Sequence, residues 1–156
     1  TEGLKSGLSR GQCLLYFTVR IAFPTAKILL NARLPALTNP LTDAELEIDI
    51  YLPEFRLGLE YNGPRHYTTT EWFSEEEQFR AQRARDLMKL GLCQEKGIDL
   101  LVVTSADLWP SRIWRALARK VPVREIPDEE WHLVQWLYRH VRRYRESVYR
   151  ETGVHG

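Results

Sequence analysis

Apolar and polar side chains alternate with a period of two through residues 45–52 and again through residues 57–62. This period is typical of β-strands whose two faces meet different surroundings. The pattern predicts a β-hairpin whose two-residue turn is formed by Glu54 and Phe55. In the first strand, one face is expected to carry Leu46, Ile48, Ile50 and Leu52, and the other Glu45, Glu47, Asp49 and Tyr51.

This hairpin is expected to bring two acids together. With the predicted turn, Pro53 pairs with Arg56, and the same register pairs Asp49 with Glu60. Opposed residues on antiparallel strands have Cβ atoms ~5 Å apart, and like charges there are destabilising. A divalent metal ion held by carboxylate oxygens would offset the repulsion. A second interpretation stays open: both acids belong to a solvent-facing strand, and a slip of one residue would separate them onto opposite faces.

A histidine follows the second strand closely. Gly63 and Pro64 are strong breakers, so the strand is expected to end there. His66 then lies just beyond the strand end, within reach of the same pocket. Two carboxylates and a histidine at one strand end suit metal-assisted hydrolysis.

Two segments before the hairpin have weaker patterns. Residues 12–19 are rich in aromatic and β-branched residues, which favours a strand, although the beginning of a helix stays open. Pro24 occupies a position where a helix could start. Residues 26–33 then predict a short helix that ends near Pro35.

A longer helix is expected after the hairpin. Ser74, followed three residues later by Glu77, matches a capping box, and the helix should run to about Lys96 and stop at Gly97. Its apolar side would consist of Phe79, Leu87 and Leu90, supported by Ala84 and Met88.

Three charged residues in this helix, Arg83, Asp86 and Lys89, are spaced so that they can face the hairpin as one band. The alternative for Arg83 and Asp86 is a surface ion pair worth less than ~1 kcal/mol. Gly91 inside the helix either weakens it or marks a close contact with the sheet.

The second half of the chain predicts one more strand and two helices. Residues 98–104 form a continuous apolar run, which suits a buried central strand. Ser111 is expected to cap a helix over residues 112–120, and a last amphipathic helix should cover residues 128–150. The order of elements predicts an α/β domain with a small mixed β-sheet flanked by helices.

Composition agrees with one globular domain of 156 residues with net charge +1. The chain has no apolar run long enough for a membrane span, and its start lacks a signal-peptide pattern. Cys13 and Cys93 are expected to be reduced thiols of a cytoplasmic protein, nucleoid-associated if the source is bacterial. The absence of an initial Met suggests a processed or shortened chain, or a domain of a longer protein.

The motifs also carry a family resemblance. Asp49 and the Glu60-Tyr61-Asn62 triplet resemble the D…(D/E)xK core of the restriction-endonuclease-like nucleases. The segments LEIDIYLPE, LGLEYNGPRHY, ARDLMK and CQEKGIDLLVV are similar to the very-short-patch-repair-like endonucleases and their phage-type homing endonuclease relatives. The resemblance covers roughly residues 14–105. It implies a restriction-endonuclease-like nuclease domain over residues 1–121, with residues 122–156 as a C-terminal helical extension packed on it.

The resemblance implies roles by position. Asp49 and Glu60 would be ligands of Mg²⁺ or Mn²⁺. His66 would act on the attacking water or the scissile phosphate. Asp86 would be a further acid near the site, and Lys89 a phosphate contact.

Two departures from the family pattern affect the expected chemistry. Asn62 stands at the catalytic position where many restriction enzymes have lysine, so a positive charge must come from His66 or Lys89, or the role of the lysine is not filled. Relatives often carry a glutamate in the first helix after a Phe-Pro pair, where this chain has Thr25-Ala26-Lys27. Glu45 or Glu47 could take its place.

The resulting expectation is a metal-dependent endodeoxyribonuclease that hydrolyses phosphodiester bonds in DNA, by nicking or by cutting both strands. The alternative is a nuclease-fold domain that no longer cuts, and that binds nucleic acid or a partner protein within a larger protein. Arginines on the last helix could track a phosphate backbone, or they form an ordinary solvated face. The candidate nucleic-acid contacts are Arg65, Arg83, Lys89, Arg139, Arg142 and Arg143.

Overall fold

A computed structural model describes residues 7–64 and 72–152 of the chain. Its principal helices and strands, in chain order, are α2 (Arg10–Ala22), β1 (Leu29–Thr38), β2 (Glu45–Leu52), β3 (Leu57–Asn62), α3 (Glu75–Glu95), β4 (Asp99–Thr104), α4 (Pro110–Ala118) and α5 (Trp131–Thr152). Three short 3₁₀ turns lie between them: η1 (Pro53–Phe55), η2 (Ser105–Asp107) and η3 (Asp128–Glu130).

The four strands form one mixed sheet in the order β1-β2-β3-β4. β1, β2 and β3 are antiparallel neighbours, whereas β4 pairs with β3 in parallel. A parallel neighbour requires a crossover connection, and α3 lies within it. The predicted mixed α/β architecture is therefore confirmed.

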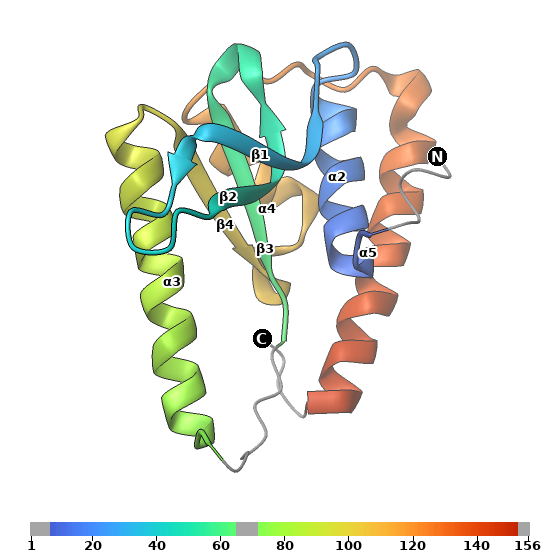
Figure 1. Cartoon of the computed structure of the whole chain (residues 1–156). Coiled ribbons are helices and arrows are strands. Elements are labelled where there is room, and N and C mark those ends of the chain that lie inside the picture. Colours follow the sequence, from blue (N-terminus) through green and yellow to red (C-terminus); the bar gives the residue numbers. More distant parts are fainter. Residues whose placement is uncertain (1–6, 65–71, 153–156) are drawn as a thin grey trace.

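Helices cover both faces of the sheet (Figure 1). On one face, apolar residues of α2, α4 and α5 form a buried cluster with those of β2 and β3, including Leu15, Leu117, Leu137 and Leu59. On the other face, Cys93 of α3 packs in a second cluster with Tyr51 of β2. The long C-terminal helix thus shares the main core with the sheet.

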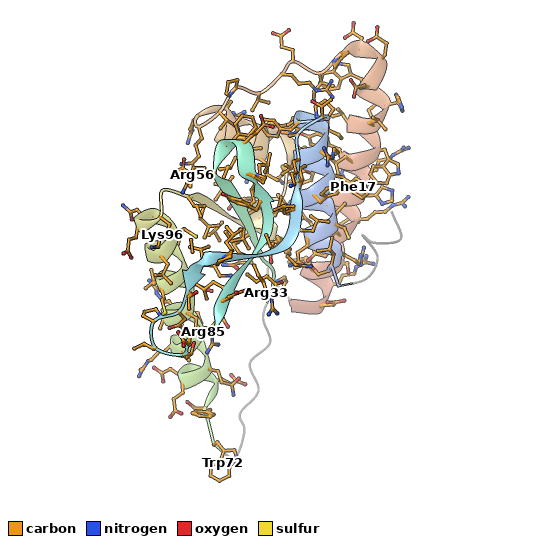
Figure 2. The ribbon with its side chains drawn as sticks, turned by 45° about the horizontal axis from the view of Figure 1, so that its top comes forward. Phe17, Arg33, Arg56, Trp72, Arg85 and Lys96 are labelled. Carbon is orange, nitrogen blue, oxygen red and sulfur yellow. The ribbon has the colours of Figure 1, made fainter. Side chains whose placement is uncertain are left out.

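The predicted hairpin register is confirmed, although the predicted turn is wrong. Leu57 pairs with Leu52, and the next two pairs follow in step as expected. Instead of a two-residue turn, Pro53–Phe55 form a 3₁₀ turn, and Arg56 adopts a left-handed conformation with φ of 47°. Proline at the start of the turn favours this helical geometry because its φ is already near the helical value. Figure 2 shows Arg56 beside Lys96, whose carbonyl accepts a hydrogen bond from it.

For residues 12–19 the helix, which the sequence had left open beside a strand, is confirmed, whereas the helix predicted over residues 26–33 is wrong. Residues 12–19 lie in helix α2, where Ser9 and Gln12 form a capping box and the buried residues recur at helical spacing. The short helix expected over residues 26–33 does not form: residues 29–33 belong to strand β1, which pairs with β2, and residues 26–28 lie in the segment before it. Backbone pairing with a neighbouring strand outweighs the weak helical preference of so short a segment.

The faces of β2 are also partly different from the prediction. Ile50 belongs to the cluster under α2, but Ile48, expected on the same face, packs in the cluster under α3. The switch of face between Ile48 and Ile50 occurs beside Asn31 of β1, which lies between their partners Ala32 and Leu30. Asn31 has φ of 49°. A left-handed residue interrupts regular alternation in a strand.

Helix α3 has the predicted bounds but not the predicted apolar face. Ser74 accepts a hydrogen bond from Glu77 N–H at the N-cap, as expected. However, Phe79, Leu87 and Leu90 are 50%, 59% and 38% exposed, and Cys93 is the buried residue of the helix. The N-terminal turns of α3, which contain Phe79, extend past the sheet, with Trp72 at the far end (Figure 2).

Other expectations for the second half are adjusted. β4 is an edge strand of the sheet, not a central one. α4 starts at Pro110 with Trp109 at the N-cap, so Ser111 lies inside the helix. In the described residues, both cysteines are free thiols, and no helix has the length and apolar character needed to cross a membrane.

Candidate functional site

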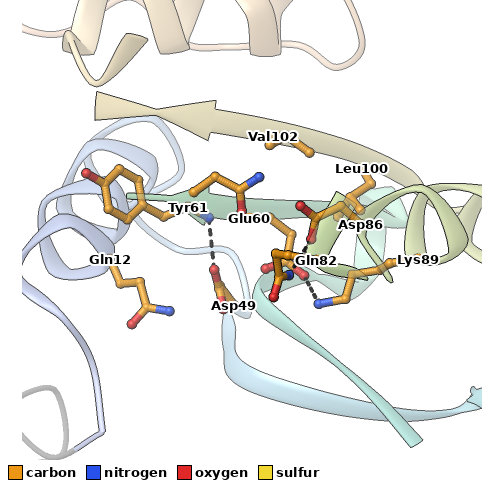
Figure 3. A pocket seen from close by; sticks show the side chains of 10 residues that line it. Gln12, Asp49, Glu60, Tyr61, Gln82, Asp86, Lys89, Leu100 and Val102 are labelled. Atoms are coloured by element: carbon orange, nitrogen blue, oxygen red, sulfur yellow. Dashed lines mark hydrogen bonds and ion pairs between the residues drawn. The ribbon is translucent and has the colours of Figure 1, made fainter. Parts of the chain in front are cut away.

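A polar pocket of about 190 Å³ lies where β2, β3 and α3 meet the start of α2 (Figure 3). Each of these four elements contributes side chains, and β4 closes the apolar side. The lining residues are Gln12, Asp49, Glu60, Tyr61, Asn62, Gln82, Asp86, Lys89, Leu100 and Val102. Most of the described residues predicted for catalysis are therefore brought together here.

Asp49 is held by the backbone of the neighbouring strand. Its Oδ2 accepts a hydrogen bond from Tyr61 N–H at 2.9 Å. Backbone pairing between β2 and β3 ends at Ile50 and Leu59. Beyond that pair, the Asp49 carboxylate accepts a hydrogen bond from a backbone amide of β3. This bond directs Asp49 toward β3 and toward the next acid along that strand.

Glu60 is a buried acid with a cationic neighbour. The residue is 8% exposed, and its Oε1 accepts a hydrogen bond from Lys89 Nζ at 2.6 Å. The same ammonium group donates to Glu47 O at 2.7 Å. Lys89 thus connects α3 with both β2 and β3 at the floor of the pocket.

The two acids interact with each other. Burial, together with a hydrogen bond to Asp49 and the negative charge of Asp49, raises the pKa of Glu60 to about 8, although the neighbouring Lys89 lowers it. A carboxyl group with this pKa keeps its proton most of the time at neutral pH. Asp49 and Glu60 therefore line the same pocket and influence each other's charge.

The donor set fits a magnesium ion bound mainly by water. Within residues 7–64 and 72–152, no group of three or more His, Cys, Asp or Glu side chains is arranged to hold a metal ion. Mg²⁺ is commonly held by only one or two carboxylates and keeps several waters. Asp49 and Glu60 offer such a pair of hard oxygen donors, provided that Glu60 gives up its proton.

Helix α3 lines the pocket with residues at helical spacing. Asp86 and Lys89 face the pocket as predicted. Arg83 does not: it lies on the exposed side, and Gln82 takes the position nearest the site. Gln82 Nε2 donates to Asp86 Oδ1 at 2.9 Å. The α3 residues that line the pocket are Gln82, Asp86 and Lys89, at the spacing i, i+4, i+7. The charge pattern alone did not reveal this set because Gln82 is uncharged.

Gln12 of α2 is a pocket residue that the sequence did not indicate. It follows Gly11, a position where an added Cβ would lie 2.1 Å from the ring of Tyr61. The missing side chain lets the first turn of α2 approach the end of β3. No local sequence signal connects Gln12 with the acids, because the contact depends on how α2 crosses the sheet.

Not all of the remaining predicted residues can be placed at the pocket. His66 and Arg65 fall outside the described residues. Asn62 lines the pocket. The exposed arginines of α5, at positions 139, 142 and 143, are not among the residues that line it.

The two acids proposed to replace the missing first-helix glutamate do not reach the site. Glu45 is exposed, and Glu47 forms an ion pair with Arg33 at 3.5 Å on the sheet edge. Neither belongs to the described lining of the pocket. The residues Thr25, Ala26 and Lys27 lie between α2 and β1.

The chain is similar to three viral proteins. It is 38% identical over 107 residues to Uncharacterized protein 033L of Invertebrate iridescent virus 3, which is 65% of this chain and 52% of that protein. It is 40% identical over 79 residues to Uncharacterized protein 307L of Invertebrate iridescent virus 6, covering 47% of this chain and 40% of that protein. Uncharacterized protein 094L of Frog virus 3 is 33% identical over 81 residues, 51% of this chain and 52% of that protein.

The matched region spans about half the length of these relatives or less. No family model matches the chain, and no solved structure matches it. The printed names of the relatives state no activity, so the function has to be inferred from the pocket.

Proposed function

We propose that the chain is a Mg²⁺- or Mn²⁺-dependent endonuclease of the restriction-endonuclease-like type, which hydrolyses phosphodiester bonds in DNA. The observation that carries this proposal is the meeting of Asp49 and Glu60, from neighbouring strands, in one polar pocket beside Lys89. The order of these residues along the chain also supports it, because they stand in the motifs that resemble the nuclease family. The mixed sheet flanked by helices agrees with that fold.

Asp49 and Glu60 would hold the metal ion, which supplies the positive charge that polarises the phosphoryl group and lowers the pKa of a bound water. The protein prepares this site by orienting Asp49 through the Tyr61 amide. Ionising Glu60 in its buried position is costly, so metal binding and proton release are coupled there.

Lys89 is proposed to supply the charge that Asn62 cannot. Its ammonium group is already directed into the pocket by Glu60 and the Glu47 carbonyl. A fixed cation beside the scissile phosphate stabilises the negative charge that grows in the transition state. The amide of Asn62 can donate to a phosphate oxygen, and Asp86 keeps the α3 side of the pocket polar.

His66 is proposed as the general base or as a donor to the leaving oxygen, according to its place after β3 in the motif. The exposed arginines Arg139, Arg142 and Arg143 of α5 are proposed to contact phosphates of the DNA backbone, together with Arg65 and Arg83. Arg139, Arg142 and Arg143 form no ion pair with acids in the described part of the chain. Such contacts would make binding strongly dependent on salt.

Cleavage of a labelled DNA duplex in Mg²⁺ or Mn²⁺, beside a reaction in EDTA, tests the proposal. Asp49→Asn and Glu60→Gln remove the charges with little change in shape and are expected to lower cleavage by at least ~100-fold. Glu54→Gln is the matched control, since Glu54 is an exposed acid at the opposite end of the same hairpin. Wild-type rates in both pocket variants would refute the assignment.

One observation favours the alternative of a domain that binds but does not cut. The ion pair with Lys89 partly satisfies Glu60 without any metal, and the motif lysine is replaced by Asn62. A gel-shift assay in EDTA distinguishes the two functions. Binding of DNA over a range of duplexes, with no products in either metal, would support the binding module and exclude the nuclease.

A further inference from the structure

Two tyrosines connect the C-terminal helix with the acid pocket. Tyr61 of β3 and Tyr144 of α5 have their hydroxyl oxygens 2.8 Å apart. Tyr61 is also the residue whose backbone N–H donates to Asp49. One residue therefore contacts α5 through its side chain and a pocket acid through its main chain.

The ring of Tyr61 is enclosed by backbone. An added Cβ at Gly11 would lie 2.1 Å from the ring, and one at Gly63 would lie 2.8 Å from it. Tyr144, which completes the enclosure, is itself covered by the Arg10 guanidinium at 5.3 Å from its ring centroid. The ring is thus held by α2, by the end of its own strand and by α5.

We propose that Tyr144 is a positioning residue for the acid pair: it fixes the ring of Tyr61 and thereby the backbone amide that orients Asp49. Tyr144 is not among the residues that line the pocket, so it acts only through Tyr61. The consequence for cleavage rests on the proposed nuclease function, whereas the link between α5 and Asp49 does not.

Removing a group that orients a metal ligand typically weakens metal affinity by 10- to 100-fold. Tyr144 is one step further away, so Tyr144→Ala is expected to weaken Mn²⁺ binding by about ten-fold and Tyr144→Phe by about three-fold. The double variant Tyr61→Phe/Tyr144→Phe should be no worse than either single variant. Each single variant leaves one hydroxyl without its hydrogen-bond partner, whereas the double variant removes both hydroxyls together.

The first experiment uses the metal-free protein. Hydrogen exchange of the Tyr61 amide, followed by NMR, is expected to accelerate by about ten-fold in Tyr144→Ala and less in Tyr144→Phe. Tyr138→Phe is the matched control, because the Tyr138 hydroxyl accepts from Ser111 N–H at 3.1 Å and joins the same helix to α4. That variant should leave exchange at Tyr61 unchanged.

The second experiment measures Mn²⁺ affinity by titration calorimetry, well below the unfolding temperature of every variant. Weaker binding in the Tyr144 variants and wild-type binding in Tyr138→Phe would support the proposal. At saturating Mn²⁺ the Tyr144 variants should cleave DNA within about two-fold of the wild-type rate, because Tyr144 contacts no reacting group.

Unchanged exchange and unchanged Mn²⁺ affinity in both Tyr144 variants would overturn the proposal. Equal loss in Tyr138→Phe would also overturn it, since the effect would then be one of general stability. If the wild-type protein cuts no DNA, the nuclease function fails, but the exchange experiment still decides whether Tyr144 positions Asp49.

Discussion

Lys89 Nζ lies 2.6 Å from Glu60 Oε1, so a cation from α3 contacts the buried acid of β3. The contact lowers the pKa of Glu60 against the effects of burial and of Asp49. In the proposed nuclease, Lys89 would also supply from a helix the positive charge that the strand motif lacks at Asn62. The predictions below concern this pair and the groups that hold it in place.

Replacing Lys89 by Met should raise the pKa of Glu60 further, because the one opposing charge is removed. The free energy of unfolding at neutral pH is expected to fall by about 1–3 kcal/mol, the usual range for a hydrogen bond to a charged group. Chemical denaturation measures this loss. Lys96→Met, at an exposed position after α3, should change it by less than ~0.5 kcal/mol. Equal effects of the two substitutions would contradict the assigned role.

Glu60 should make stability depend on pH in a direction opposite to that of most acids. Its pKa is about 8 in the folded protein against 4.5 as the ordinary value, so the folded state binds the proton more tightly. This contribution to stability is complete below the unfolded pKa and is lost as the pH rises through about 8. The Glu60→Gln variant has no carboxyl group at this position, so this contribution to the pH dependence of stability is absent from it. Between about pH 6 and 9 the wild type should lose on the order of a few kcal/mol relative to that variant, as measured by urea denaturation.

A constant stability difference between wild type and Glu60→Gln over this range would show that Glu60 is already ionised at neutral pH. Urea denaturation without divalent metal is required, because a bound cation would favour the ionised form. Glu54→Gln, at the exposed end of the hairpin, serves as the control. It keeps Glu60, so the stability difference between this variant and the wild type should not change in the way expected for Glu60→Gln.

Substitutions at Asp49 should separate its structural and chemical roles. Asp49→Ala leaves the Tyr61 N–H without its acceptor, and a part-buried donor without a partner costs about 1–3 kcal/mol. Asp49→Asn retains an acceptor oxygen and should cost less than half as much. Both variants should bind Mn²⁺ much more weakly. Thermal unfolding and metal titration together test this, and equal stability of the two variants would argue against the hydrogen bond.

Two glycines in helices should respond in opposite directions to the same substitution. Gly11→Ala places a Cβ 2.1 Å from the Tyr61 ring, and overpacking of this kind destabilises by about 1–3 kcal/mol. Gly91→Ala in α3 meets nothing within 4 Å and should stabilise the protein by roughly 0.5–1 kcal/mol, the helical preference of alanine over glycine. Calorimetric melting of both variants gives the comparison. Stabilisation by Gly11→Ala would mean that α2 does not pack directly on Tyr61.

Local features of the sequence determined the hairpin register and the bounds of α3. The register depends on alternation and on the number of residues between the strands, so it was predictable even though the turn type was not. Ser74 and Gly97 similarly mark helix ends through hydrogen bonds and backbone conformations that belong to a few neighbouring residues. The same register predicted that Asp49 and Glu60 would meet, but their place in one pocket lies beyond the last paired residues of the two strands, Ile50 and Leu59.

Only the tertiary structure decided whether the segments with ambiguous sequence patterns became helix or strand. It also decided which residues of distant helices lie at or beside the pocket. Residues 29–38 are a strand because β2 lies beside them, and residues 12–19 are helical because a capping box and a buried stripe prevail over β-branched composition. Gln12 lines the pocket from α2, and Tyr144 of α5 contacts the hydroxyl of Tyr61. Their positions depend on how helices pack across the sheet, and packing between distant segments leaves no periodic trace in either segment.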